Sequence, residues 1–153
     1  MSVVLNGPGE GETFRAGPYR FRILEGGAAT GGRLGIVEFT LPPAHPSPPQ
    51  HIHREHDESF LVVYGTVRFT SGTDAHDAPA GSLVTVPTGA PHTFENLDRE
   101  QQATLLCTVV PERYIGFFKE LAALAAEIGG DPDPEQTFAI MQRYATEPYQ
   151  PTS

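Results

Sequence analysis

The stretch HIHREHDESFLVVYG, residues 51–65, decides the fold because two alternating histidines precede a run of strand-forming residues. Side chains two residues apart on a strand point to the same face, so His51 and His53 project together, about 6 to 7 Å apart along the backbone. Glu58 begins the next β-rich run, and Gly65 provides the turn after it. Two imidazoles and a nearby carboxylate are typical ligands of one divalent metal ion.

A second stretch, GSLVTVPTGAPHTFEN at residues 81–96, supplies a further candidate ligand. The sequence PTG at 87–89 predicts a turn that places His92 on a strand facing the first motif. Alternation on that strand puts Phe94 on the same side as His92, and Asn96 is expected to fix the strand end through hydrogen bonds. The predicted metal ligands are therefore His51, His53, Glu58 and His92.

The chain up to residue 110 alternates short β-rich runs with Gly, Pro, Asn and Asp, which predicts an all-β fold, either a sandwich or a closed barrel. The expected strands cover residues 19–24, 34–41, 50–53, 59–64, 67–70, 82–86, 92–96 and 103–109. Five prolines at positions 42, 43, 46, 48 and 49 predict an extended loop before His51, because proline cannot donate to a β-ladder.

Two helices are expected after the strands. Residues 113–128 carry apolar side chains at helical spacing, and Gly129 and Gly130 form a stop signal. Asp133 is the predicted N-cap of a second helix over 134–145, with Pro134 at its first position and Gln136 completing a capping box. The predicted packing residues are Ile115, Phe118, Leu121 and Ala125 on the first helix, and Phe138, Met141 and Tyr144 on the second.

We expect one domain over residues 1–153, with a barrel over about 13–110. For the two helices, a role in covering the barrel or contacting a second subunit is favoured over a lid above the site. A homodimer is expected, because exposed apolar faces of such barrels often pair.

Composition excludes several classes of protein. The formal net charge of -9 opposes binding to nucleic acid, which requires a clustered basic surface. No apolar run approaches the roughly 20 residues of a membrane helix, and no secretory signal is recognised, so a cytoplasmic protein without a membrane partner is expected. Cys107 is the single cysteine, which excludes an intrachain disulfide and a thiolate metal site, and its apolar context predicts a buried, inert thiol.

An apolar pocket is expected beside the metal site. The alternation that starts at Glu58 predicts Phe60, Val62 and Tyr64 on the inward face, where Phe94 would join them. Glu38 lies in the run 34–41, in which both alternating sets of positions carry apolar residues, so the pattern does not decide which face is inside. Glu38 is therefore a candidate for a second carboxylate in the pocket. The prediction for His56 and Asp57 is a solvent-exposed turn, and His45 is expected in a loop.

The two motifs resemble those of the cupin superfamily over about residues 34–110. One position departs from the pattern, since His45 stands where the family often has Gly. The resemblance implies a jelly-roll or double-stranded β-helix fold, with His51, His53, Glu58 and His92 as metal ligands. Residues 53–65 and the segment FFKEL at 117–121 are similar to quercetin 2,3-dioxygenase-like proteins. That similarity implies cleavage of flavonols with O2, and a Glu58 that serves as both ligand and base.

Three imidazoles and one carboxylate suit Fe, Mn, Ni, Co or Zn rather than Ca, and leave one or two positions open on the ion. With the apolar pocket, this predicts a dioxygenase acting on a flavonol-like or other aromatic or enolic small molecule, with Glu58 as the general base. The main alternative is a non-enzymatic cupin that binds metal and a small molecule. A sugar or keto-acid isomerase or epimerase is less favoured, because it requires more polar and basic groups in the pocket.

Overall fold

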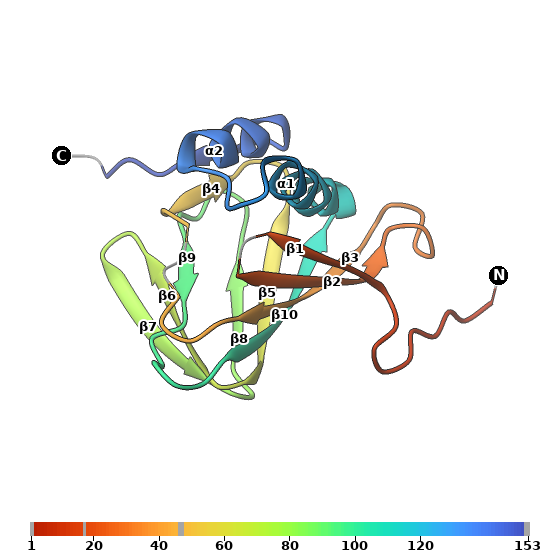
Figure 1. Cartoon of the computed structure of the whole chain (residues 1–153), viewed down its shortest axis with the longest axis horizontal. Coiled ribbons are helices and arrows are strands. Elements are labelled where there is room, and N and C mark those ends of the chain that lie inside the picture. The colour runs from red at the N-terminus through yellow and green to blue at the C-terminus, as the bar shows by residue number, and fades with distance from the viewer. Residues whose placement is uncertain (1, 17, 46–47, 152–153) are drawn as a thin grey trace.

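The computed structural model describes residues 2–16, 18–45 and 48–151, and it shows a barrel of short strands followed by two helices (Figure 1). The predicted all-β double-stranded β-helix with two C-terminal helices is confirmed. The strands are β1 (Glu12–Ala16), β2 (Tyr19–Gly26), β3 (Gly35–Leu41), β4 (His51–His53), β5 (Asp57–Tyr64), β6 (Thr66–Ser71), β7 (Asp74–Pro79), β8 (Leu83–Val86), β9 (Thr93–Glu95), β10 (Ala103–Val110) and β11 (Thr146–Pro148). The helices are the 3-10 helix η1 (Glu112–Tyr114), α1 (Ile115–Ile128) and α2 (Pro134–Arg143).

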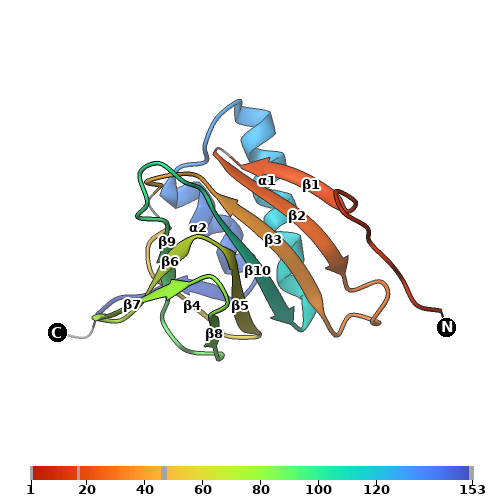
Figure 2. The ribbon, with the colours of Figure 1, turned by 90° about the horizontal axis from the view of Figure 1, so that it is seen from below.

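The strands form three antiparallel sheets. The large sheet has the order β1-β2-β3-β10-β5-β8, and the smaller ones are β7-β6-β9 and β11-β4. Figure 2 shows helix α1 lying along the face of β1, β2 and β3, while α2 lies beside β4. Strand β11, near the C-terminus, pairs directly with β4. The short strand β4 therefore lies between the barrel and the C-terminal part of the chain.

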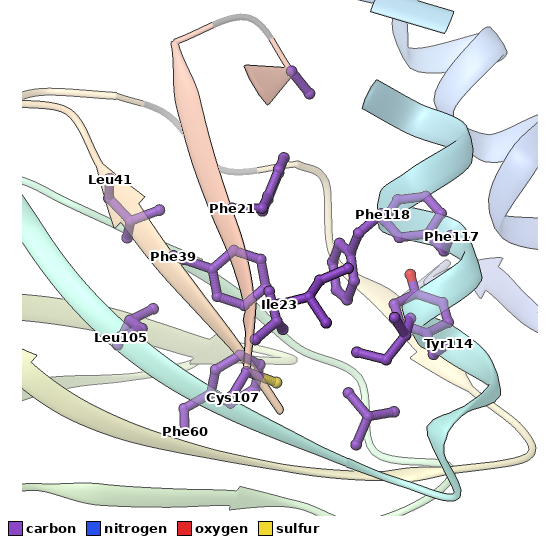
Figure 3. Packing of buried hydrophobic residues seen from close by; sticks show 14 of the residues in the cluster. Phe21, Ile23, Phe39, Leu41, Phe60, Leu105, Cys107, Tyr114, Phe117 and Phe118 are labelled. Atoms are coloured by element: carbon purple, nitrogen blue, oxygen red, sulfur yellow. The ribbon is translucent and has the colours of Figure 1, made fainter. Parts of the chain in front are cut away.

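The core follows the two-residue period of the strands. Burial alternates along β3 and β10, so Phe39 and Cys107 point inward while the intervening side chains face out. Helix α1 contributes Phe118, whose ring lies 5.5 Å from that of Phe21 and 5.2 Å from that of Phe39 (Figure 3). This aromatic contact joins the helix to the sheet, and burying a side chain of this size contributes about 2 to 3 kcal/mol.

The predicted end of the first helix and start of the second are confirmed, whereas the second helix ends at Arg143 and not at residue 145. Gly129 is the C-cap of α1 in the left-handed conformation. Asp133 caps α2 by accepting a hydrogen bond from the backbone N–H of Gln136, whose side chain accepts one from the backbone N–H of Asp133. Residue 113 is not in α1, however, because residues 112–114 form the tighter turn η1 and the α-helix begins at Ile115.

Three strands were not predicted from the sequence: β1, β7 and β11. Strand β7 has the sequence DAHDAP, which has few β-forming residues and is held as an edge strand by its pairing with β6. Strand β11 is three residues long, ends in proline, and exists because β4 pairs with it. The predicted proline-rich loop is present between β3 and β4, although Pro46 lies outside the described residues.

Cys107 is completely buried as predicted, and burial raises the pKa of its thiol well above the usual range. Within the described ranges, no helix has the length and apolar character needed to cross a membrane.

Candidate metal centre

Strand β4 places both of its histidines in the barrel interior. His51 and His53 are 4% and 2% exposed, whereas Ile52 between them faces the other side. His51 exchanges two backbone hydrogen bonds of 3.0 Å with His92, so these two residues form a bridge between their segments. His92 is buried as well, and its ring lies 4.4 Å from that of His51. The second motif therefore faces the first one, as the sequence predicts.

Glu58 completes the group from strand β5. Its side chain is buried, and its Oε2 lies 3.3 Å from Nε2 of His53 and 3.2 Å from Nε2 of His92. The ligand atoms offered by His51, His53 and His92 all lie within 4.8 Å of one another. The four predicted metal ligands thus converge on one point inside the barrel.

The tautomers of two histidines follow from their partners. Nδ1 of His51 lies 3.1 Å from the carbonyl oxygen of Pro49, which can only accept, so Nδ1 carries the proton. Nδ1 of His53 lies 2.7 Å from Oγ1 of Thr146, whose own proton is donated to the carbonyl of Tyr144. His53 is therefore the donor to Thr146. In both rings the lone pair remains on Nε2, which is the atom that binds a metal when Nδ1 is held in this way.

The atoms present fit a bound cation. Nε2 of His53 is buried and has no hydrogen-bond partner among the described residues, and its lone pair lies 3.3 Å from the carboxylate oxygen of Glu58. Two acceptors facing each other in a buried site repel unless a positive charge lies between them. Ligands bound at 2.0–2.2 Å to one ion are themselves about 3 Å apart, which is close to the spacing of these two atoms.

The electrostatics of the site also favour metal binding. Burial lowers the pKa of His51 to about 3 and lowers that of His53, so His51 is neutral at physiological pH and its lone pair is available. Burial alone would raise the pKa of Glu58, but the neighbouring imidazoles of His53, His56 and His92 hold it well below the usual range. Imidazoles beside an ionised carboxylate are compatible with a single divalent transition metal ion.

The prediction for His56 was wrong, whereas Asp57 is exposed as expected. His56 is 5% exposed, and its ring lies 4.1 Å from that of His53 and 4.4 Å from that of Tyr114. Its Nε2 lies 3.3 Å from Oε1 of Glu58. The period of two from Glu58 places His56 on the same inward face, so this signal was available in the sequence.

A cavity of about 300 Å³ extends from the metal centre into the space between the sheet and the helices. Phe60 and Phe94 line it as predicted, together with His51 and Glu58 at its inner end. Helices α1 and α2 provide much of its opposite wall, including Phe118, Leu121 and Met141. The helices therefore cover the barrel, as the sequence analysis favoured, but they also lie over the site, which it had ranked lower.

The charged side chains that line the cavity are acidic. Of its described lining residues, none is a lysine or an arginine, and the carboxylates are Glu58 at the inner end and the exposed Asp131. His45, in its predicted loop, also lines the cavity, with its ring 4.4 Å from that of Tyr19. Burial, and secondarily Asp131, raises the pKa of Tyr19 to about 12, so its phenol is protonated.

Three predicted pocket residues lie elsewhere. Val62 is buried in the core but does not line the cavity. Tyr64 is 50% exposed and donates a hydrogen bond to Gln101, because a register shift opposite Thr104 and Leu105 breaks the alternation of β5. Glu38 lies on the outer face of β3, where both of its oxygens accept hydrogen bonds from Arg22 at 3.1 and 3.0 Å.

Asn96 behaves as predicted, since its buried amide donates to the carbonyls of Pro42 and Gln101 at 3.1 and 2.8 Å. Thr146 and Tyr114 were not predicted as neighbours of the site. Both come from the C-terminal part of the chain, and no local sequence pattern connects them to the histidine motif.

Comparison with known proteins agrees with this fold. Residues 37–109 match the protein family described as "Cupin domain". Solved structures with the same fold include a predicted oxalate decarboxylase from Thermotoga maritima, with 17% identity and a TM-score of 0.64, in a match that covers 71% of this chain and 99% of the other. An RmlC-like cupin from Shewanella frigidimarina has 19% identity and a TM-score of 0.61, with 75% of this chain and 96% of the other covered. KdgF from Halomonas sp. has 16% identity and a TM-score of 0.59, with 69% of this chain and 92% of the other covered. The search of curated proteins gave no match. The chain therefore has the cupin fold, and these findings support a place in the cupin superfamily.

Proposed function

We propose that this chain is a metal-dependent dioxygenase that acts on a flavonol-like or other aromatic or enolic small molecule. The observation that carries the proposal is the cavity of about 300 Å³, which is lined by aromatic side chains and ends at His51 and Glu58. A flat apolar ligand can bury its rings there and bring a hydroxyl group to the metal centre.

The proposed metal ligands are His51, His53, Glu58 and His92. A divalent transition metal held by these residues would supply Lewis acidity toward a substrate oxygen and the capacity to react with O2. The proposed role of Glu58 is to accept the proton of the substrate hydroxyl, since its carboxylate is ionised and lies at the inner end of the cavity. The apolar walls exclude water from this transfer.

The charge of the cavity favours this class of ligand over anionic ones. An anionic group that lies away from the proposed ion would lose its hydration without gaining a lysine or arginine partner among the described lining residues. This argues against the sugar or keto-acid isomerase reading. A non-enzymatic role would use the same cavity, and the protein would then bind the small molecule without converting it.

The test is to prepare metal-free protein, load separate samples with Fe, Mn, Ni, Co and Zn, and measure bound metal by elemental analysis. Oxygen uptake is then followed with flavonols and with simpler enediols. We expect about one ion per chain and uptake with at least one metal and one flavonol. Flavonol binding without uptake under every metal would identify a binder, and failure to bind any metal would exclude the proposed centre.

A further inference from the structure

We propose that His56 is a positioning residue that holds one oxygen of Glu58, so that Glu58 offers a single oxygen to the metal ion. This inference rests on the metal centre of the proposed function, but not on the dioxygenase reaction. His56 lies between the two motif ligands His53 and Glu58, and it has no role in the proposed chemistry.

The two oxygens of the Glu58 carboxylate have different surroundings. Oε2 lies 3.2 and 3.3 Å from Nε2 of His92 and His53, which is the side where the ion is expected. Oε1 lies 3.3 Å from Nε2 of His56 and accepts no other hydrogen bond from the described residues. His56 therefore determines how the carboxylate is turned.

The ring of His56 is itself held on several sides. It lies between the rings of His53 and Tyr114, at 4.1 and 4.4 Å. The hydroxyl of Thr88 donates a hydrogen bond of 2.8 Å to the backbone carbonyl of His56, and the backbone N–H of Thr88 donates to Asp57 at 2.7 Å. The turn between β4 and β5 is thus tied to the turn before β9. A buried ring packed in this way has little freedom to rotate away from Glu58.

This arrangement affects the number of positions open to substrate. A carboxylate that is free to turn can bind an ion through both oxygens, and the second oxygen then occupies a position on the ion. A hydrogen bond from His56 to Oε1 opposes that turn and keeps the position available. Three imidazoles and one carboxylate oxygen then leave one or two positions for substrate and O2.

One competing role for His56 can be separated by its chemistry. His53, His56 and Glu58 also offer ligand atoms within 4.8 Å of one another, so His56 could itself bind an ion. Nε2 of His56 cannot do both, because donation to Oε1 requires a proton on Nε2 and metal binding requires a lone pair there. If His56 positions Glu58, the ion has three imidazole ligands and none of them belongs to His56. If His56 is a ligand, one of the imidazoles bound to the ion is its own.

The experiment compares cobalt-loaded protein with two variants. In His56→Gln the amide nitrogen reaches about as far as Nε2 and can still donate to Oε1, whereas His56→Phe keeps a ring between His53 and Tyr114 but has no donor. His76→Phe, on the exposed strand β7, is the matched control. Cobalt affinity is measured by competition with a chelator, coordination number by visible absorption, and imidazole ligands by X-ray absorption.

We expect His56→Phe to weaken cobalt binding by about 10- to 100-fold and to change its absorption toward a higher coordination number, with the imidazole count unchanged. His56→Gln is expected to keep the original spectrum. His56→Asn, which is too short to reach Oε1, replaces the Phe variant if that variant does not fold.

The inference is overturned if both Gln and Phe variants lose one imidazole ligand, because His56 is then a ligand. It is also overturned if the Phe spectrum equals that of unaltered protein. Absence of cobalt binding in the unaltered protein would reject the metal centre, and the inference with it. Cobalt binding without oxygen uptake rejects only the dioxygenase proposal.

Discussion

Nδ1 of His53 donates a hydrogen bond of 2.7 Å to the hydroxyl of Thr146, which lies 93 residues later in the chain. The two residues are also direct partners in the pairing of β4 with β11. The C-terminal strand therefore supports the backbone that carries the histidine motif and fixes the direction of one of its rings. The candidate metal centre therefore depends on a segment that lies beyond both helices.

Replacing Thr146 by Val tests this support, because valine keeps the β-branched shape and removes the acceptor. We expect metal affinity to fall by about 10- to 100-fold, since the orientation of a ligating histidine depends on the partner of its other nitrogen. The unpaired Nδ1 should also reduce the free energy of unfolding by about 1 to 3 kcal/mol. Chelator competition and urea unfolding measure the two effects. Thr104→Val, on β10, is the control, and equal metal affinity in both variants would refute the role of Thr146.

The convergence of the candidate metal ligands could be predicted because the sequence patterns that indicate it are local. The period of two along β4 brings His51 and His53 to one face, and the turn at 87–89 places His92 opposite them. The same period applied backward from Glu58 would have identified His56. The capping box at Asp133 was equally local, since its two hydrogen bonds join residues three apart in the chain.

Other features depend on partners that are distant in the sequence. Tyr64 was assigned to the wrong face because the register shift against β10 interrupts an alternation that the isolated strand would have kept. Glu38 lies in a strand whose residues are apolar on both phases, so only the pairing of β3 with β2 brings it beside Arg22. Thr146 reaches His53 through the β11–β4 pairing, which no local propensity indicates.

Glu58→Gln separates the two proposed roles of the carboxylate. Glutamine keeps an oxygen that can bind the ion but cannot accept the substrate proton at neutral pH. We expect the variant to retain metal with reduced affinity and to lose turnover by about 10²- to 10⁴-fold, the usual contribution of a general base. Elemental analysis and oxygen uptake with a flavonol measure these effects. A metal-loaded variant that consumes oxygen at the unaltered rate would show that Glu58 is not the base.

Leu121→Trp tests the cavity without touching the metal centre. Leu121 lines the cavity from α1, so the larger indole occupies space that the ligand requires. We expect flavonol affinity to fall at least about 10-fold while metal content stays the same, because an overfilled site loses the contacts of the ligand. Leu124→Trp is a matched control, since Leu124 is a half-buried residue of the same helix that does not line the cavity. Equal flavonol affinity in both variants would place the binding site elsewhere.

The outer face of β5 and β8 is the surface on which we expect a homodimer. Leu61 and Leu83 are paired neighbours that are 38% and 65% exposed, and Val63 beside them is 52% exposed. Strand β8 is also at the edge of the large sheet. Leu83→Glu should convert a dimer to a monomer in light-scattering measurements, because a charge on this face opposes burial. Val4→Glu on the exposed N-terminal segment is the control, and a monomeric unaltered protein would contradict the expectation.

The stability of the metal-free protein is expected to depend on pH through His51. Burial lowers the pKa of this histidine from 6.5 to about 3, and the neighbouring His92 and His53 lower it further in the same direction. In the unfolded chain His51 takes up a proton as the pH falls through about 6.5, whereas in the folded chain it stays neutral until about pH 3. Between these values the unfolded state binds more protons, so acid favours unfolding.

The contribution of His51 to stability is therefore complete above about pH 6.5 and decreases by about 1.4 kcal/mol per pH unit below it. From pH 6.5 to 5 the expected loss is about 2 kcal/mol from this residue alone. Urea unfolding of metal-free protein at several pH values measures the slope, and His51→Asn removes the titrating group while keeping a polar side chain. We expect a shallower slope for the variant. Parallel pH profiles for the two proteins would mean that His51 is accessible to protons in the folded state, which is incompatible with its burial beside the other two imidazoles.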